Sequence, residues 1–226
     1  MKLRLSVVLI SMALIGALMG CKKEPTPNFH FEYFGYEEGR YVIYDVIEIT
    51  HDQKINQHDT LIYQLKTKWG EPYIDNQNQE GKEFLRFIRS SPSEEWELIH
   101  KWHGVINGIR AELIEENQRS VKLVFSPTYS KSWNMNASNL DGEIGCYYRD
   151  IHGETTVNGT FLDSTLVVET DWVPNQINDN RAYEVYAKGI GLVYKYYKKN
   201  RYFDFGDPEV GEGKELYYTY LSSGVE

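Results

Sequence analysis

The sequence has little positive charge, and this scarcity excludes one large class of partner. Its 226 residues contain 24 Lys and Arg against 33 Asp and Glu, a formal net charge of −9 at pH 7. A surface that binds nucleic acid needs clustered cationic side chains to neutralise phosphates. We therefore expect no nucleic acid among the partners of this protein.

Recognisable catalytic motifs are also missing from the sequence. No Gly-x-Ser-x-Gly, Ser-x-x-Lys or His-Glu-x-x-His pattern occurs, and these patterns supply activated nucleophiles or metal-bound water. Adjacent carboxylates such as Glu94 and Glu95 point to opposite sides of a strand. We therefore predict no catalytic residues and a non-enzymatic protein. A pair of carboxylates that face each other across a cleft would not be visible in a sequence.

The sequence lacks a convincing metal-binding pattern as well. His100 and His103 lie three residues apart, and on a strand such residues point to opposite faces, so they do not converge on one zinc ion. Acidic side chains are close together near Gly206, but their spacing does not match the ligand positions of an EF-hand loop. We predict no metal site and no cofactor.

Long apolar runs are absent beyond residue 20, and the run at the start of the chain is short. Lys2 and Arg4 precede a mostly apolar stretch, Leu5–Leu18, of 14 residues. A helix that crosses a bilayer needs about 20 apolar residues. Positive residues followed by a run of this length are typical of a secretory signal. We predict that residues 1–20 form a signal peptide that is removed.

The end of the apolar run carries a resemblance to a known class of signal. Leu18-Met19-Gly20-Cys21 resembles the lipobox of bacterial lipoproteins, in which small residues precede a cysteine. The resemblance implies that Cys21 becomes the first mature residue and carries a diacylglycerol and an amide-linked acyl chain such as palmitate. Two or three acyl chains hold a protein durably on a membrane. The lipid on Cys21 is the one covalent group that we expect.

The segment after Cys21 has the composition of a tether. Residues 22–28 contain two prolines and two lysines and no apolar side chain, which does not suit a core element. We assign residues 21–29 to the lipidated cysteine and its tether, and residues 30–226 to a single extracytoplasmic domain. Fully extended, residues 22–28 reach about 25 Å, so the domain would lie close to the membrane.

Disulfides are excluded once Cys21 is lipidated, because Cys146 is then the remaining cysteine. The core must rest on the burial of apolar side chains, even in an oxidising compartment. We interpret Cys146 as a small buried side chain. Removal of Lys2 and Arg4 leaves 22 basic against 33 acidic residues, a net charge of −11. Such a protein is repelled by anionic lipid, so the acyl chains must supply the attachment.

Alternation of apolar and polar side chains dominates the sequence from about Tyr33, as expected of half-buried strands. In one stretch Leu61, Tyr63, Leu65, Thr67 and Trp69 point one way. Similar patterns predict further strands at residues 96–102, 109–113, 121–125, 165–172, 183–187, 190–197 and 216–221. Residues 41–49 are apolar on both sides apart from Asp45 and Glu48, which is typical of a central strand covered on both faces or of one that crosses between sheets.

Turn-forming residues separate these segments. We predict loops at residues 75–81, 90–93, 175–180 and 206–213, and a polar turn at residues 115–120. Gly189 and Gly191 predict a tight turn between two strands. Short strands at this spacing favour a mostly β fold, an antiparallel meander that forms a single-domain β-sandwich or partly closed barrel.

Three segments resemble uncharacterised lipoproteins from Bacteroidota. They are Tyr33-Phe34-Gly35 through Val46, Lys131-Ser132-Trp133-Asn134, and Tyr183-Glu184-Val185 through Lys195. Relatives often have proline where Gly35 stands. The family has no activity to carry over, and Cys21 is the one functional residue that it implies. It implies the outer membrane as the destination, and Lys22 agrees, because an aspartate there would mark inner-membrane retention.

Two functional classes follow from these observations. The first is a membrane-anchored extracytoplasmic lipoprotein, a non-enzymatic accessory subunit or binding module of the outer membrane, with an outer-membrane protein complex as its partner. The second is a surface lipoprotein that binds or processes glycans. Aromatic abundance supports the second class, because the sequence contains 18 Tyr and 5 Trp, and exposed aromatic rings can stack on sugars or form interfaces. Most of these rings have a simpler interpretation as packing between strands.

Overall fold

The alternating segments of the sequence form long antiparallel strands. The computed structural model describes residues 27–55, 57–74, 78–206 and 209–226. The predicted signal peptide and Cys21 lie outside these residues, as does part of the expected tether. Two short 3-10 helices, η1 (Phe31–Phe34) and η2 (Gln53–Ile55), are present. Within the described ranges, no helix has the length and hydropathy that a membrane span requires.

The described strands run in chain order from residue 40 to the C-terminus. They are β1 (Arg40–Asp52), β2 (Gln57–Ile74), β3 (Glu80–Arg89), β4 (Glu97–Asn107), β5 (Arg110–Glu115), β6 (Gln118–Val124), β7 (Ser132–Asn134), β8 (Gly145–Val157), β9 (Thr160–Thr170), β10 (Asn178–Ala187), β11 (Gly191–Arg201) and β12 (Glu212–Val225).

These strands form one sheet from two consecutive meanders. Strands β1 to β6 are neighbours in chain order, as are β7 to β12, and the two meanders join where β1 pairs with β12. The edge strands β6 and β7 then approach each other, because the Val121 amide donates to the Met135 carbonyl at 2.9 Å, just beyond β7. The predicted mostly β, single-domain fold is confirmed, and of the two expected architectures the structure has the partly closed barrel.

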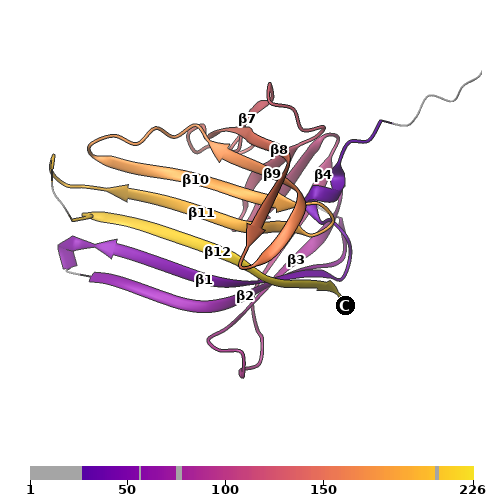
Figure 1. Ribbon diagram of the computed structural model, residues 1–226, viewed down its shortest axis with the longest axis horizontal. Coiled ribbons are helices and arrows are strands. Elements are labelled where there is room, and N and C mark those ends of the chain that lie inside the picture. Colours follow the sequence, from indigo (N-terminus) through magenta and orange to yellow (C-terminus); the bar gives the residue numbers. More distant parts are fainter. Residues whose placement is uncertain (1–26, 56, 75–77, 207–208) are drawn as a thin grey trace, which may run out of the picture.

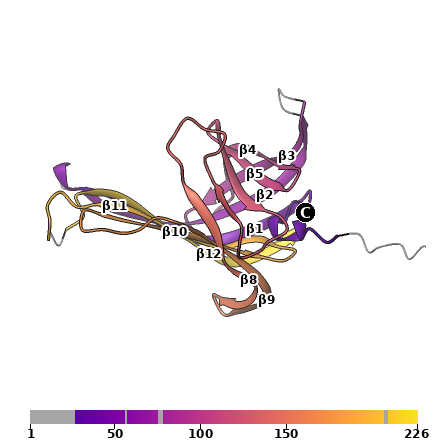
Figure 2. The same ribbon diagram turned by 90° about the horizontal axis from the view of Figure 1, so that it is seen from above.

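The sheet is curled at one end and flat at the other. Figures 1 and 2 show β10, β11, β12, β1 and β2 extending side by side away from the curled part, while β3 to β5 and β7 to β9 wrap around. We call the extension the wing. By register, it comprises residues 47–52 and 57–62 of β1 and β2, residues 178–183 of β10, residues 196–201 of β11 and residues 212–217 of β12.

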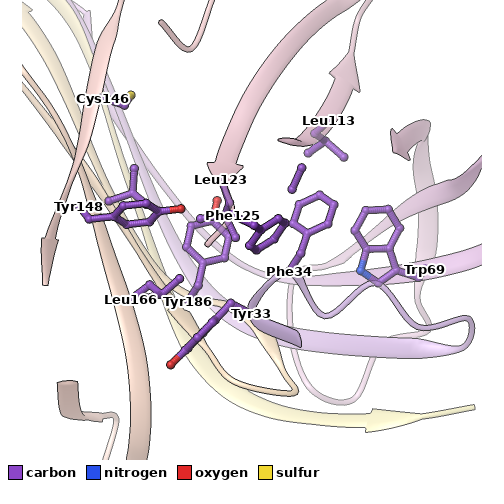
Figure 3. Close-up of a cluster of buried hydrophobic side chains, with 12 residues drawn as sticks. Tyr33, Phe34, Trp69, Leu113, Leu123, Phe125, Cys146, Tyr148, Leu166 and Tyr186 are labelled. Carbon is purple, nitrogen blue, oxygen red and sulfur yellow. The ribbon is translucent and has the colours of Figure 1, made fainter. Parts of the chain in front are cut away.

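The curled end is closed by η1 and filled with apolar side chains. Figure 3 shows Tyr33 and Phe34 of η1 beside Trp69, Phe125 and Tyr148, all buried. The Tyr148 hydroxyl donates to the Val124 carbonyl at 2.9 Å and accepts from the Val124 amide at 3.0 Å, so it bridges the gap between β6 and β8. The η1 segment therefore acts as a plug at one end of the barrel.

Several predicted boundaries need correction. Strands β5 and β6 extend into the expected turn at residues 115–120. The turn is only Glu116-Asn117, both with positive φ, as a two-residue hairpin turn requires. Residues 41–49 lie in a central strand, but one face is open at Ile47, which is 41% exposed. Of the predicted loops, residues 80–81, 178–180 and 212–213 belong to β3, β10 and β12.

Candidate functional site

The inside of the curled sheet contains a cleft of about 460 Å³. Its apolar wall is formed by Phe34 of η1, Trp69 of β2, Phe84 of β3 and Leu113 of β5. Because η1 closes one end, the cleft runs along β1 toward the wing, where Glu48 and Lys214 line it. A largely preformed apolar cavity with a few convergent polar groups is the usual form of a small-molecule site.

Charged side chains line this cleft in unequal numbers. Five are cationic and three are carboxylates, a net charge of +2 in a protein whose sequence carries −9: Arg40, Arg86, Lys122, Lys195 and Lys214 against Glu48, Glu115 and Glu184. The charge of the cleft is therefore opposite in sign to that of the whole chain.

A cluster of three charges crosses the interior from β6 to the adjacent strands β10 and β11. The Glu184 carboxylate on β10 lies 3.6 Å from Lys122 Nζ on β6 and 3.5 Å from Lys195 Nζ on β11, and it accepts a 2.5 Å hydrogen bond from the Tyr186 hydroxyl. Burial would raise the pKa of Glu184, but the two lysines lower it to about 2. Glu184 is therefore a permanent anion at neutral pH and has no proton to give.

Lys122 reaches this cluster because of an irregularity in the sheet. The register between β5 and β6 shifts at Ala111 and Glu112, so Lys122 has no paired residue on β5. Strict alternation with Val121 and Leu123, which were expected inside, predicts Lys122 on the outer face. The bulge turns it inward instead, where it is 7% exposed.

Arg86 on β3 is held differently from the other cations. Its Nη2 donates to the Tyr218 hydroxyl on β12 at 2.9 Å, and its guanidinium lies 4.4 Å from the centre of the Trp102 ring. Among the described residues, no carboxylate lies within ion-pair distance of Arg86. Its contacts in the cleft are therefore a neutral hydroxyl on β12 and an aromatic ring on the neighbouring strand β4.

The end of the cleft nearest the wing is polar. Glu48 on β1 accepts a hydrogen bond from the Tyr63 hydroxyl at 3.1 Å and pairs with Lys214 Nζ at 2.6 Å. The Lys214 side chain is half exposed. We call this end the mouth of the cleft.

The histidines and the cysteine considered in the sequence take separate places. His100 lines the cleft, where it stacks on Trp102, and its Nε2 lies 3.5 Å from Glu116. His103 stacks on Tyr73 with the ring centres 3.8 Å apart. Cys146 is 1% exposed, and burial raises the pKa of its thiol to about 12. Within the described ranges, no three metal-ligating side chains are grouped to hold an ion.

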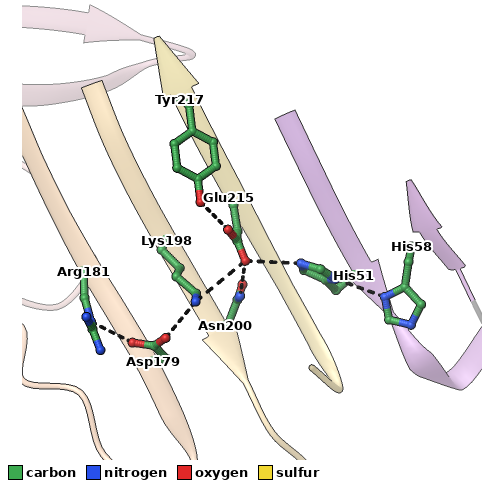
Figure 4. A network of polar contacts seen from close by, with 8 residues as sticks. All are labelled: His51, His58, Asp179, Arg181, Lys198, Asn200, Glu215 and Tyr217. Atoms are coloured by element: carbon green, nitrogen blue, oxygen red, sulfur yellow. Dashed lines mark hydrogen bonds and ion pairs between the residues drawn. The ribbon is translucent and has the colours of Figure 1, made fainter. Parts of the chain in front are cut away.

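A second polar cluster lies on the outer face of the wing. Figure 4 shows Glu215 at its centre, accepting hydrogen bonds from Asn200 at 2.6 Å and from the Tyr217 hydroxyl at 2.5 Å. Lys198 Nζ lies 2.8 Å from the Asp179 carboxylate and so connects Asp179 to the cluster. These groups neutralise one another across three neighbouring strands, so we interpret the cluster as a clamp that holds the wing flat.

Tyrosines next to this cluster form a packed ladder. Tyr183 stacks on both Tyr194 and Tyr196, at 5.6 and 5.3 Å, and the Arg149 guanidinium lies 4.7 Å from its ring centre. Tyr196 then meets the edge of Tyr217. The rings therefore turn toward one another. A platform for sugars would need ring faces open to solvent.

Of the polar residues of the cleft, the sequence pointed to His100 and not to the cations. Arg86, Lys195 and Tyr218 each lie on a strand, and inward-facing charges resemble outward-facing ones in a sequence pattern. Alternation gives no signal around Arg86 and Glu184, because apolar side chains occupy both faces of these segments.

Comparisons with known proteins give little further direction. No family model matches the chain, and no curated protein matches it. A solved structure described as a "putative lipoprotein" from Parabacteroides distasonis is 8% identical, with a TM-score of 0.40, over 87% of this chain and 100% of that chain. This likeness is too weak to carry an argument about fold or function.

Proposed function

We propose that this protein is a non-enzymatic, membrane-anchored binding module of the bacterial outer membrane, in which the cleft of the curled sheet holds a small ligand. The cleft is the observation that carries this proposal, because it combines a 460 Å³ cavity with aromatic walls and buried charges. The anchor is inferred from the lipobox that ends at Cys21.

Binding accounts for Glu184 and Glu48 of the cleft better than hydrolysis does. A glycosidase needs one carboxyl group that is protonated near neutral pH and a second carboxylate opposite it. Glu184 is held ionised by Lys122 and Lys195, with a pKa of about 2. Glu48 is committed to an ion pair with Lys214. These contacts support a rigid, charged lining that orients a ligand.

The aromatic rings also favour a small ligand over an extended glycan. In the tyrosine ladder Tyr183 stacks on Tyr194 and Tyr196, and in the cleft Trp102 contacts both Arg86 and His100. An extended glycan needs a row of open rings along a surface. A compact ligand that enters the cleft needs only the apolar wall near Trp69 and Phe84.

Binding of a neutral fluorescent probe tests this proposal. N-phenyl-1-naphthylamine carries no charge, so its binding reports on the cavity alone. The chain from residue 21 with Cys21→Ser retains every described residue and needs no detergent. We expect saturable binding of one probe per chain. Leu216→Trp, which fills the cleft from β12, should weaken binding by about tenfold or more, a loss of about 1.4 kcal/mol.

Leu221→Trp is the matched control, because Leu221 lies on the same strand, is exposed and does not line the cleft. Its affinity for the probe should equal that of the parent protein. Absence of saturable binding, or equal effects of the two tryptophans, would overturn the proposed cleft function.

A further inference from the structure

We propose that the cleft selects amphiphilic anions, with the acidic head group of the ligand on Arg86 and Tyr218 and its apolar body against Trp69 and Phe84. This inference rests on the proposed function, because it names the ligand class of the same cleft. A carboxylate on an aliphatic chain is the simplest member of the class.

Elimination among the cations of the cleft points to Arg86. Lys122 and Lys195 share Glu184, and Lys214 pairs with Glu48. Arg40 pairs with Glu37, which lies outside the lining. Arg86 remains as the lining cation that no carboxylate neutralises among the described residues. A guanidinium presents a planar set of donors that matches a carboxylate, so an anion would complete its shell.

Tyr218 adds a second donor at the same place. Its hydroxyl oxygen accepts the hydrogen bond from Arg86 at 2.9 Å, which leaves the hydroxyl hydrogen available to a ligand. Lys195 Nζ lies 5.6 Å from the centre of the Tyr218 ring and adds positive potential. A head group beside this hydrogen-bonded pair would therefore meet two donors and a nearby cation.

The apolar wall begins directly beside this pair. Phe84 is two residues from Arg86 on the same face of β3, and its ring centre lies 4.6 Å from that of Trp69 on β2. Trp69 in turn contacts Phe34 of the plug at 5.2 Å. A ligand whose head lies on Arg86 can thus place an apolar body against aromatic rings. A fully hydrated anion such as free phosphate would leave that wall unused.

Competition with the neutral probe measures this selectivity. Decanoate, decanol and decylamine share one chain length and differ in their head groups, and each would displace N-phenyl-1-naphthylamine from the chain from residue 21 with Cys21→Ser. We expect decanoate to bind about tenfold more tightly than decanol, as a charged hydrogen bond to Arg86 predicts, and decylamine to bind weakest.

Substitution of Arg86 should remove the preference for anions without filling the cavity. Arg86→Met retains the length and apolar contacts of the side chain but not its charge, so decanoate should lose its advantage over decanol. Tyr218→Phe should lower decanoate affinity by a smaller factor, because one neutral hydrogen bond is lost. A circular dichroism spectrum like that of the parent protein shows in each case that the variant is folded.

Arg89→Met is the matched control, since Arg89 lies on the same strand but contacts Trp96 and Gln64 outside the cleft. It should leave all three ligands within about twofold of the parent. If the parent protein binds decanoate and decanol equally and still binds the probe, the anion selectivity is overturned and the binding function stands. Failure of the probe itself to bind would instead overturn the function on which this inference rests.

Discussion

Gly35 is the residue at which the plug meets the turn between β10 and β11. Its φ is +62°, and a Cβ at this position would lie 2.3 Å from the Ile190 carbonyl oxygen. Gly191, with φ of +106°, faces Gly35 from the start of β11. The glycines at 189 and 191 were predicted to form a tight turn, and their positive φ values confirm this. The contact with Gly35 was beyond the sequence, because it joins residues that are far apart in the chain.

Gly35→Ala should destabilise the protein by about 3 kcal/mol or more, because the left-handed conformation costs about 1–2 kcal/mol and the backbone contact must also open. Urea unfolding of the two proteins measures the difference. Gly159→Ala is the control, since Gly159 also has positive φ, of +78°, but open space around it. If the two variants lose equal stability, the close contact at Gly35 contributes nothing.

At the scale of elements, the cluster of Lys122, Glu184 and Lys195 connects β6 with β10 and β11 through the interior. Its carboxylate makes stability depend on pH in a definite direction. The pKa of Glu184 falls from 4.5 to about 2 on folding. Glu184 therefore contributes its full share of the free energy of unfolding above pH 4.5. This share, about 3 kcal/mol, is lost as the pH falls toward 2.

Glu184→Gln should remove this component of the acid dependence. It should also lower the free energy of unfolding at pH 7 by about 3 kcal/mol, because the buried Lys122 and the partly buried Lys195 lose their counter-charge. Urea unfolding at pH 7, 5 and 3 measures both effects. Glu169→Gln is the control, because Glu169 pairs with Arg149 at 3.3 Å near the surface, and its loss should cost less than about 1 kcal/mol. Parallel pH profiles of wild type and Glu184→Gln would contradict this account.

The elements also show where patterning succeeds and where it fails. Leu65, Thr67 and Trp69 are buried as alternation predicts, because each packs on the inner face of a regular strand. Leu61 follows the same pattern yet is 59% exposed, since it lies on the wing, where no second layer covers the sheet. Lys122 departs from the pattern because a bulge shifts the register. The alternation of apolar and polar residues is a local property of the sequence. Whether a second layer covers a strand, and where a bulge occurs, depends on the other strands.

At the scale of the whole molecule, the plug and the mouth of the cleft lie apart along β1. The described chain enters beside η1, and in Figure 1 the wing extends to the other side. The C-terminus lies near the same entry, where the Glu226 amide donates to the Gly39 carbonyl at 3.0 Å. A short tether to Cys21 would therefore place the plugged end toward the membrane and the mouth away from it.

Cys21→Ser should move the full-length protein from the detergent phase to the aqueous phase when membranes are partitioned in Triton X-114. The physical reason is the loss of acyl chains, each worth about 0.8 kcal/mol per buried CH₂. Incorporation of labelled palmitate should disappear in the same variant. Cys146→Ser is the control, because Cys146 is buried and should not affect partitioning. Partitioning of the Cys21 variant into detergent would contradict the anchor.

Features that depend on neighbouring residues in the chain could be predicted from the sequence. The signal and lipobox that predict an anchor at Cys21, the class of the fold, and the inward side of regular strands such as β2 all follow from local order and spacing. The absence of a disulfide follows from the cysteine count once Cys21 is lipidated. These features need no knowledge of which strands meet.

The plug of the curled sheet and the cationic cleft of this acidic chain are visible in the folded structure and not in the sequence. Arg86 and Tyr218 lie 132 positions apart in the chain, and Lys122 reaches Glu184 because a bulge turns it inward. The chemistry of the cleft is set by side chains that converge across a folded sheet. Their convergence depends on strand order and register, which are fixed by the packing of the whole chain.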